Sequence, residues 1–229
     1  MIKNQSIKTI KTIFFDGGDV LVKKIVNINK QISNYLDISL DLYHQKEKEL
    51  IKTDKDIPQA WRDIATLEKE INYFRMFSGK LLKHLNLDVK EETVEYMAMC
   101  HVKRCYVPVE GAREILDYLS QKYQLGIISN CLVSRKYFEL KDFDLEKYFD
   151  EVVLSREIDV DKPDPRIYKY ALKKAGRQPE ECAFIDNKVE NLQAVLDLGF
   201  GKVVLFPKED YEGADFPAID SLAELKVTF

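Results

Sequence analysis

Residues 11–22 read KTIFFDGGDVLV, and the break in the middle of this stretch is the feature that decides the fold. The run Ile13-Phe14-Phe15 has the short, aromatic and β-branched character of a buried strand, and it ends directly on Asp16. Two glycines, a second acid and a new apolar run follow. The stretch raises two questions: why a buried strand ends on a carboxylate, and why the residue two positions further on is Gly18 rather than another acid.

Composition excludes several classes of protein. The 229 residues are 45% hydrophobic and 32% charged, as in an ordinary globular protein. The net charge of -4 comes from 35 basic and 39 acidic side chains that are interspersed, so we expect no nucleic acid and no membrane among the partners. No segment approaches the roughly 20 apolar residues of a membrane helix, and the apolar run before Asp16 is too short for a signal peptide. We therefore expect a cytoplasmic protein.

The four cysteines, Cys100, Cys105, Cys131 and Cys182, lack the paired spacing of a disulfide framework. Cys100-His101 with Cys105 is an alternative, as part of a zinc site. A zinc site usually starts with two closely spaced ligands and needs a matching second pair, which the sequence does not contain. Buried or half-buried thiols on a helix are therefore the preferred interpretation.

Strand and helix patterns alternate in the second half of the chain. The segments expected to form strands are continuous apolar runs, without alternating polar residues, which predicts a parallel sheet covered on both faces. Helical patterns over residues 110–122, 165–175 and 189–198 lie between these runs. The sequence therefore predicts an α/β fold: a Rossmann-like parallel sheet with helices on both faces. The expected strands are residues 11–15, 125–129, 151–154, 183–185 and 202–206.

The region between the first two strands breaks this alternation, because it contains only helical patterns. Amphipathic segments are expected over residues 32–51, 71–87 and 91–105, and Asp56-Ile57-Pro58 marks a break between helices. We predict a discontinuous α/β core, residues 1–23 and 106–229, and a small all-helical domain, residues 24–105.

Polar residues follow four of the expected strands: Asp16, Ser129-Asn130, Lys162 and Asp186-Asn187. Ligands of parallel α/β sheets bind beyond the carboxyl ends of the strands, so these groups are expected to converge. Singly, each is explained as a turn or helix-capping residue. Together they indicate a reactive site.

The set matches the needs of phosphoryl transfer. A carboxylate can attack phosphorus and form an aspartyl-phosphate, provided that positive charge offsets the repulsion between two anions. Lys162 supplies one such charge, and Mg²⁺ held by Asp16 and Asp186 would supply the rest. Ser129 and the neighbouring N–H groups can hold a phosphate oxygen.

Four motifs, FFDGGDVL, IISN, DKPDPRIY and FIDNKVEN, are similar in order and approximate spacing to those of the haloacid dehalogenase (HAD) superfamily. The resemblance covers the whole chain, because members of this type also carry a helical cap after the first motif. It implies that Asp16 is the nucleophile and a metal ligand, that Ser129 and Lys162 are catalytic, and that Asp186 binds the metal. Ser129, Asn130 and Lys162 are expected to bind the phosphate of the substrate. Asn187, where many members have a second acid, and Asn191 would support the metal ligands.

Gly18 departs from the family pattern. Most phosphatases of the family have an aspartate there, which protonates the leaving oxygen and later activates water. The pattern uses the backbone carbonyl of this residue as a metal ligand, so Gly18 retains the metal site and loses the acid. A positioned acid usually contributes about a hundred- to ten-thousand-fold in rate.

Three functions are consistent with this departure. The first is a magnesium-dependent phosphatase acting on a small phosphorylated metabolite with a good leaving group, such as an anomeric sugar phosphate, or using water or Asp19 in place of the acid. The second is a haloacid dehalogenase, since halide leaves without a proton, although the dehalogenases have a bulky aromatic at this position. The third is a silent binding or regulatory protein of the same fold.

Substrate choice is expected to lie in the cap, which would close over the site and exclude water. Each candidate there is more often a surface or packing residue than a substrate contact, and Trp61 in particular is expected in the core of the cap. The candidates are His44, Trp61, Arg62, Arg75 and Arg104.

Overall fold

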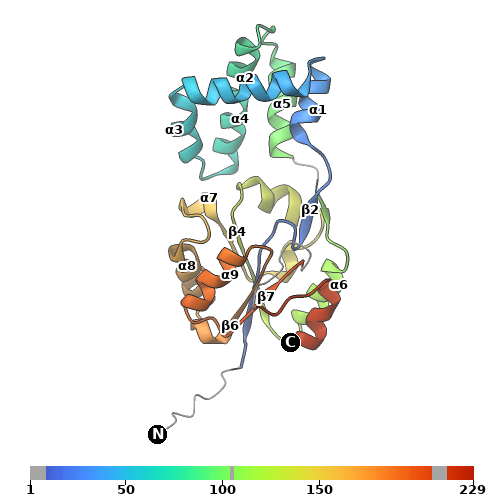
Figure 1. Cartoon of the computed structure of the whole chain (residues 1–229), viewed down its shortest axis with the longest axis vertical. Coiled ribbons are helices and arrows are strands. Elements are labelled where there is room, and N and C mark those ends of the chain that lie inside the picture. Colours follow the sequence, from blue (N-terminus) through green and yellow to red (C-terminus); the bar gives the residue numbers. More distant parts are fainter. Residues whose placement is uncertain (1–8, 104–105, 208–215) are drawn as a thin grey trace. The chain divides into compact units, whose positions relative to one another are not determined.

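The computed structural model describes residues 9–103, 106–207 and 216–229, and its contacts divide the chain into two compact units (Figure 1). The α/β unit comprises Met1–Lys23, Pro108–Cys131 and Phe143–Phe229. The helical unit comprises Lys24–Val107 and Leu132–Asp142. Each unit is described by itself.

The α/β unit is built on a five-stranded sheet with the strand order β5-β4-β1-β6-β7, and every pairing is parallel. All four residues of β1 are buried, because a central parallel strand is covered on both faces. This is the doubly covered parallel sheet that the continuous apolar runs predict. The strands are β1 Thr12–Phe15, β4 Gln124–Ser129, β5 Glu151–Leu154, β6 Cys182–Asp186 and β7 Lys202–Leu205.

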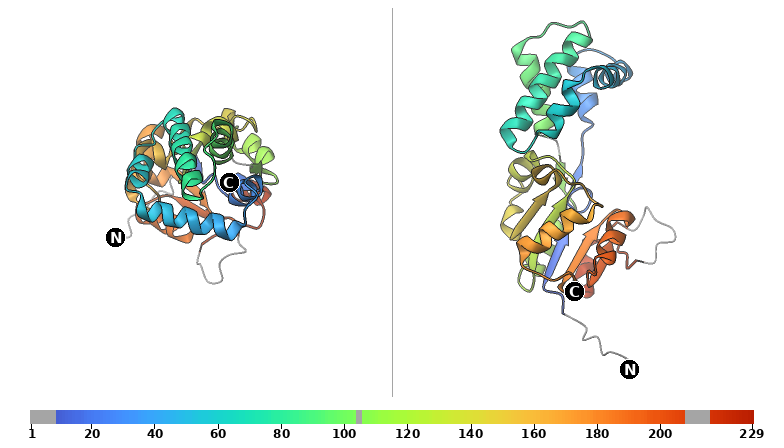
Figure 2. Two further views of the ribbon diagram at one scale, coloured as in Figure 1. Left: turned by 90° about the horizontal axis from the view of Figure 1, so that it is seen from above. Right: turned by 90° about the vertical axis from the view of Figure 1, so that its left-hand side faces the viewer.

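Helices cover the two faces of this sheet (Figures 1 and 2). α8 (Pro165–Ala175) and α9 (Val189–Asp197) pack on the face that carries Phe14 and Phe184. The short helices α6 (Ala112–Leu119) and α10 (Leu225–Thr228) pack together elsewhere in the unit. α6 buries one apolar stripe, as its sequence predicts.

The ends of α8 follow local sequence signals. The Asp164 side chain accepts a hydrogen bond from Arg166 N, Pro165 opens the helix, and Gly176 ends it with φ 64°. Aspartate at the cap, proline in the first turn and glycine after the last turn is the asymmetry that helix ends favour. Such local signals place α8 where the sequence predicts it.

The helical unit has its own apolar core, built around Tyr43, Phe74, Leu81 and Met97. All four are buried, so this unit does not depend on the sheet for its core. Its helices are α1 Ile28–Tyr35, α2 Leu40–Thr53, α3 Asp56–Arg62, α4 Leu67–His84 and α5 Glu91–Val102.

The single helical segment expected over residues 32–51 is wrong. Asp37 adopts a left-handed conformation, φ 53°, which ends α1. The Ser39 side chain then accepts from Leu42 N and starts α2. The apolar periodicity continues across the break, so it conceals a turn that local hydrogen bonding creates.

The assignment of residues 106–229 to the α/β core needs correction in two places. Tyr106 and Val107 fall in the helical unit, and so does Leu132–Asp142. Leu132 and Val133 are buried in the core of the helical unit, because the loop after β4 presents apolar side chains that pack there. This segment also contains a π-helix, Arg135–Leu140.

Two short strands, β2 (Val22–Lys24) and β3 (Tyr106–Pro108), pair where the chain leaves and re-enters the α/β unit.

Across residues 9–103, 106–207 and 216–229, no helix is both long and apolar enough to cross a membrane. In the same residues, no three His, Cys, Asp or Glu side chains lie close enough together to hold a metal ion. His101 stacks on the Phe74 ring with centroids 4.7 Å apart, and Cys105 lies outside the described residues.

The centre of the sheet has no room for a side chain at Gly126. A Cβ there would lie 2.6 Å from Phe14 Cδ1 and Cε1, so we expect Gly126→Ala to lower the free energy of unfolding by about 1–3 kcal/mol. Urea denaturation followed by circular dichroism measures this loss. The matched control is Gly79→Ala in α4, where the nearest atom is Val89 Cγ1 at 3.9 Å and the change should be neutral or stabilise by up to about 1 kcal/mol. Equal effects of the two variants would contradict this account of the packing.

Candidate active site

The site begins with the position of β1 in the sheet. β1 lies between β4 and β6. The chain adds β4 and β5 on one side of β1 and then returns to add β6 and β7 on the other side. Phe15 is in register with Ile127 on β4 and with Ile185 on β6. Asp16 and Asp186 are the next residues, so the topology places two carboxylates side by side at the carboxyl edge. Ser129, which is buried, ends β4 at the same edge.

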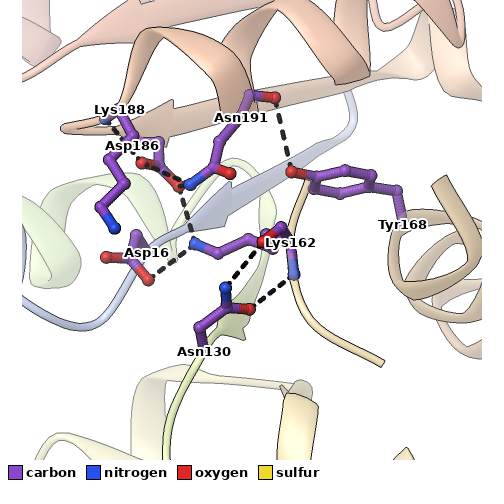
Figure 3. A network of polar contacts seen from close by, with 7 residues as sticks. All are labelled: Asp16, Asn130, Lys162, Tyr168, Asp186, Lys188 and Asn191. Atoms are coloured by element: carbon purple, nitrogen blue, oxygen red, sulfur yellow. Dashed lines mark hydrogen bonds and ion pairs between the residues drawn. The ribbon is translucent and has the colours of Figure 1, made fainter. Parts of the chain in front are cut away.

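Lys162 lies between these two carboxylates (Figure 3). Its Nζ is 2.8 Å from Asp16 Oδ1 and 2.7 Å from Asp186 Oδ2. The side chains of Lys162 and Asp186 are 2% and 0% exposed, whereas that of Asp16 is 12% exposed. Asp16 is therefore the carboxylate of this pair that an incoming ligand can reach.

The electrostatics of the three groups are coupled. Burial acts against the charged form of Lys162, but the facing carboxylates of Asp16 and Asp186 outweigh it and hold the pKa of Lys162 above its ordinary value. Burial raises the pKa of Asp186, and the ammonium of Lys162 offsets part of that rise. Lys162 is consequently a cation at neutral pH, where it neutralises one of its two partners.

Asp186 is held in place by a further set of hydrogen bonds. Asn191 Nδ2 donates to Oδ1 and Oδ2 of Asp186 at 3.1 and 3.0 Å, and Lys188 N donates to Oδ1 at 2.8 Å. Asn191 is buried, and its backbone oxygen accepts from Tyr168 Oη at 3.5 Å. Burial, with a contribution from Asp186, raises the pKa of Tyr168, so its hydroxyl stays protonated as a donor.

Asn130 fixes the loop that carries Lys162. Its Nδ2 donates to the backbone oxygen of Lys162 at 2.8 Å, and its Oδ1 accepts from Lys162 N at 2.6 Å. Both backbone groups of Lys162 are thus held by one side chain from the end of β4. In this geometry Asn130 orients the lysine, a role distinct from the phosphate contact that the sequence suggests.

The turn after Asp16 leaves the backbone of Gly18 available. Val22 N donates to Gly17 O, and Asp19 N donates to Val22 O, which is the bridge between Gly18 and Val22. In this pattern Val22 pairs with the groups on either side of Gly18 and with neither group of Gly18 itself. Asp19 is exposed, and its left-handed φ of 60° reverses the chain.

A divalent cation fits the chemistry of this donor set. Asp16 and Asp186 share one ammonium, so a negative charge remains when Lys162 is counted. Within the described part of the chain, Asp16 Oδ2 has no hydrogen-bond partner, since the only side-chain bond of Asp16 is made by Oδ1. Two neighbouring carboxylates with a backbone carbonyl form the modest all-oxygen set typical of Mg²⁺, which keeps several waters.

The remaining predicted residues lie elsewhere. Asn187 is half-buried directly after Asp186. The cap candidates belong to the helical unit: Trp61 and Arg62 line one cavity, and Arg75 and His44 line two others. Arg75 makes a two-point ion pair with Glu95, which favours a structural role, and Arg104 lies outside the described residues.

Two supporting residues were not identified in the sequence, Lys188 and Tyr168. Lys188 contributes a backbone N–H at the start of α9, and helix starts are general sites for binding carboxylates, so the helix prediction could have indicated it. Tyr168 has the spacing of an ordinary buried residue of α8 and gives no sequence signal of its own.

The sequence pattern of haloacid dehalogenase-like hydrolases matches residues 10–199. The chain belongs to this family. Two archaeal relatives are named glyceraldehyde 3-phosphate phosphatase. The protein from Methanothermobacter thermautotrophicus is 29% identical over 121 residues, 49% of this HAD-like chain and 54% of its own length. The one from Methanopyrus kandleri is 24% identical over 187 residues, covering 79% of this chain and 77% of its own.

The fold is also that of solved family structures. The 2-haloacid dehalogenase of Pseudomonas syringae pv. Tomato DC3000 superposes with a TM-score of 0.72 at 15% identity, covering 96% of this chain and 97% of its own. At this identity the likeness concerns the fold, so the choice of chemistry has to come from the residues of the site.

The stability of the carboxylate pair depends on the buried ammonium of Lys162. Lys162→Ala leaves Asp16 and Asp186 facing each other without a counter-charge, and we expect the free energy of unfolding to fall by about 3–5 kcal/mol. Urea denaturation at neutral pH in a chelator measures this loss. Lys188→Ala is the control, because Lys188 is exposed and contributes through its backbone, so a change within about 0.5 kcal/mol is expected. Similar losses in both variants would contradict the role given to Lys162.

Proposed function

We propose that this protein is a magnesium-dependent phosphatase that hydrolyses a small phosphorylated metabolite through an aspartyl-phosphate on Asp16. The proposal depends on one observation. Of two adjacent carboxylates that share the buried ammonium of Lys162, Asp16 is the one partly open to a ligand. A reachable carboxylate beside a fixed cation is the arrangement that nucleophilic attack on a phosphate needs.

In the proposed reaction a carboxylate oxygen of Asp16 attacks phosphorus, and the bond from phosphorus to the leaving alkoxide breaks. Lys162 and Ser129 hold the phosphate oxygens, and the bonds from Asn130 keep the lysine oriented. Water then attacks phosphorus, which releases inorganic phosphate and restores the carboxylate. When bound by Asp16, Asp186 and the Gly18 carbonyl, magnesium supplies the remaining positive charge that an approaching phosphate dianion requires.

The leaving group is the point at which Gly18 matters. Glycine supplies no acid, so the departing oxygen has to take its proton from water, from Asp19 or from the substrate itself. Substrates whose leaving oxygen is stable without immediate protonation are favoured, such as an anomeric sugar phosphate. The two relatives named glyceraldehyde 3-phosphate phosphatase support testing triose and sugar phosphates first.

We further propose that the helical unit acts as the cap that selects the organic part of the substrate. Trp61 and Arg62 line a cavity of about 510 Å³ within this unit, together with Glu47, Tyr73 and Phe74. A volume of this size suits a small metabolite. Trp61 also packs edge-on against Tyr73, with ring centroids 5.2 Å apart, so it contributes to the core of the unit as well.

Haloacid dehalogenation is the second candidate, because halide leaves without a proton and the absence of an acid at Gly18 would then carry no cost. The phosphatase is preferred, because Lys162 and the carboxylate pair leave a site that calls for a metal and suits a phosphate. A dehalogenase would release halide without added metal, whereas a silent binding protein would turn over neither kind of substrate.

The first test is turnover of a panel of sugar phosphates, triose phosphates, nucleotides and acyl phosphates with and without Mg²⁺. We expect phosphate release that depends on the metal and that falls by about a thousandfold or more in Asp16→Asn, since loss of a catalytic nucleophile can cost up to about a millionfold. Asp19→Asn is the matched control on the neighbouring acid, and retained activity there would also exclude Asp19 as the substitute acid. A flat response across the whole panel would overturn the phosphatase.

The second test restores the missing group. Gly18→Asp is expected to raise kcat for simple alkyl phosphates by up to about a hundred- to ten-thousand-fold, the usual contribution of a positioned acid. Nitrophenyl phosphate, whose leaving group needs no proton, should gain little. Gly18→Asn, which has the same shape without the acid, is the control. Equal gains in both variants, or on both substrates, would exclude a missing acid as the reason for slow turnover.

A further inference from the structure

The segment that follows the proposed phosphate site is held by the helical unit. β4 ends at Ser129, Asn130 and Cys131 follow, and from Leu132 the chain belongs to the helical unit until Asp142. Leu132 and Val133 are buried in the core of that unit, and Phe138 packs against it. The end of β4, where phosphate would bind, is therefore continuous with residues 132–142, which pack in the helical unit.

One buried carboxylate forms the polar part of this anchor. Glu70, in the first turn of α4, is 0% exposed, and its Oε2 accepts a hydrogen bond of 2.8 Å from Ser134 N. A buried N–H that loses such a partner keeps the full cost of its desolvation. The Glu70 carboxyl group therefore fixes the position of Ser134 N.

A second contact fixes the same segment. The Arg135 guanidinium lies over the Tyr106 ring, 5.2 Å from its centroid, and both residues belong to the helical unit. Arg135 also starts the π-helix, a rare form that occurs mostly as single-turn bulges inside α-helices and is frequent at functional sites. This segment has a defined conformation within the helical unit, and Glu70 fixes its first turn.

The opposite end of the segment is equally constrained. Asn130 makes two hydrogen bonds to the backbone of Lys162, and Lys162 pairs with Asp16 and Asp186. Only three residues separate Asn130 from Ser134, so an extended chain places their Cα atoms at most about 14 Å apart. The covalent link between the hydrogen-bonded Asn130 and Ser134 is therefore short.

We infer that Glu70 is a positioning residue for the phosphate-binding end of β4, and that it acts through its hydrogen bond to Ser134 N. This inference rests on the proposed function of the α/β site. Phosphate bound at Ser129 and a formed Glu70–Ser134 bond stabilise each other. By linkage, phosphate affinity and the order of the segment are coupled by the same factor.

The test measures the Kd of inorganic phosphate in the presence of Mg²⁺ by calorimetry on the full chain. We expect Glu70→Ala to weaken binding about tenfold, equivalent to about 1.4 kcal/mol. Glu70→Gln keeps an oxygen acceptor for Ser134 N, and its Kd should stay within about threefold of the wild type. Glu70→Asp keeps the carboxyl group but withdraws the acceptor by one methylene, and it carries the test if the alanine variant does not fold.

The control separates positioning from stability. Leu81→Ala removes a fully buried side chain from the same helix, about 16 Å along its axis from Glu70 at 1.5 Å per residue. This variant should lose stability without changing the Kd of phosphate. In hydrogen exchange, phosphate should slow exchange across residues 132–140 in the wild type and in Leu81→Ala but not in Glu70→Ala.

The outcomes distinguish the two proposals. If the wild type binds phosphate and all Glu70 variants bind it equally well, the inference fails and the proposed function stands. If Glu70→Ala and Leu81→Ala weaken phosphate equally, Glu70 is only structural and the inference fails. If the wild type binds no phosphate and hydrolyses no phosphate ester, the proposed function fails and the inference fails with it.

Discussion

The α/β unit depends on one electrostatic constraint: two carboxylates at the ends of adjacent strands are tolerable only because Lys162 lies between them. Asp16 directly follows β1 and Asp186 is the last residue of β6, and these two strands are neighbours in the sheet. Removing water from two like charges is expensive, and only a counter-charge with good geometry compensates for it. The site is therefore coupled to the sheet, since a different strand order would separate the acids and leave the lysine without partners.

The same constraint links structure to chemistry. A pair of acids with one ammonium keeps a negative charge, which repels a phosphate until a further cation arrives. The proposed metal requirement thus rests on the charge count rather than on a cage of ligands. Gly18 fits this arrangement, because its backbone carbonyl is not used by the bridge at Val22. The residue loses an acid without removing a candidate metal ligand.

Sequence reasoning succeeded where structure is set locally or by a doubly covered sheet. The strands read as unbroken apolar runs because both faces of a parallel sheet are buried, and α8 is bounded by Pro165 and Gly176. It failed at Asp37, where a left-handed residue interrupts an unbroken periodicity. It also failed at residues 132–142, whose packing depends on the distant helix α4.

Some residues of the candidate site could be predicted from the sequence and others could not, for the same physical reasons. Asp16, Lys162 and Asp186 could be predicted because each follows a recognisable strand or motif, and the structure brings the three together. The orienting role of Asn130 could not be predicted, because it consists of two hydrogen bonds to a backbone 32 residues away. Tyr168 was missed for a similar reason, since its contact to Asn191 joins two helices.

The two units bury separate cores, and this separation has a functional consequence. The core around Tyr43, Phe74 and Met97 contains no residue of the sheet, while Phe14 and Phe184 belong to a core of the α/β unit. Substitutions that reshape the helical cavity therefore need not disturb the carboxylate pair, so under the proposed function the choice of organic group can change while the proposed phosphoryl chemistry is retained. The segment after β4 limits this independence, because its apolar side chains lie in the helical core and its first residues continue from Asn130. Under the two proposals, changes in α4 near Glu70 should reach the chemistry through this segment, whereas changes around Trp61 should alter selectivity together with stability, because Trp61 also packs in the core of the unit.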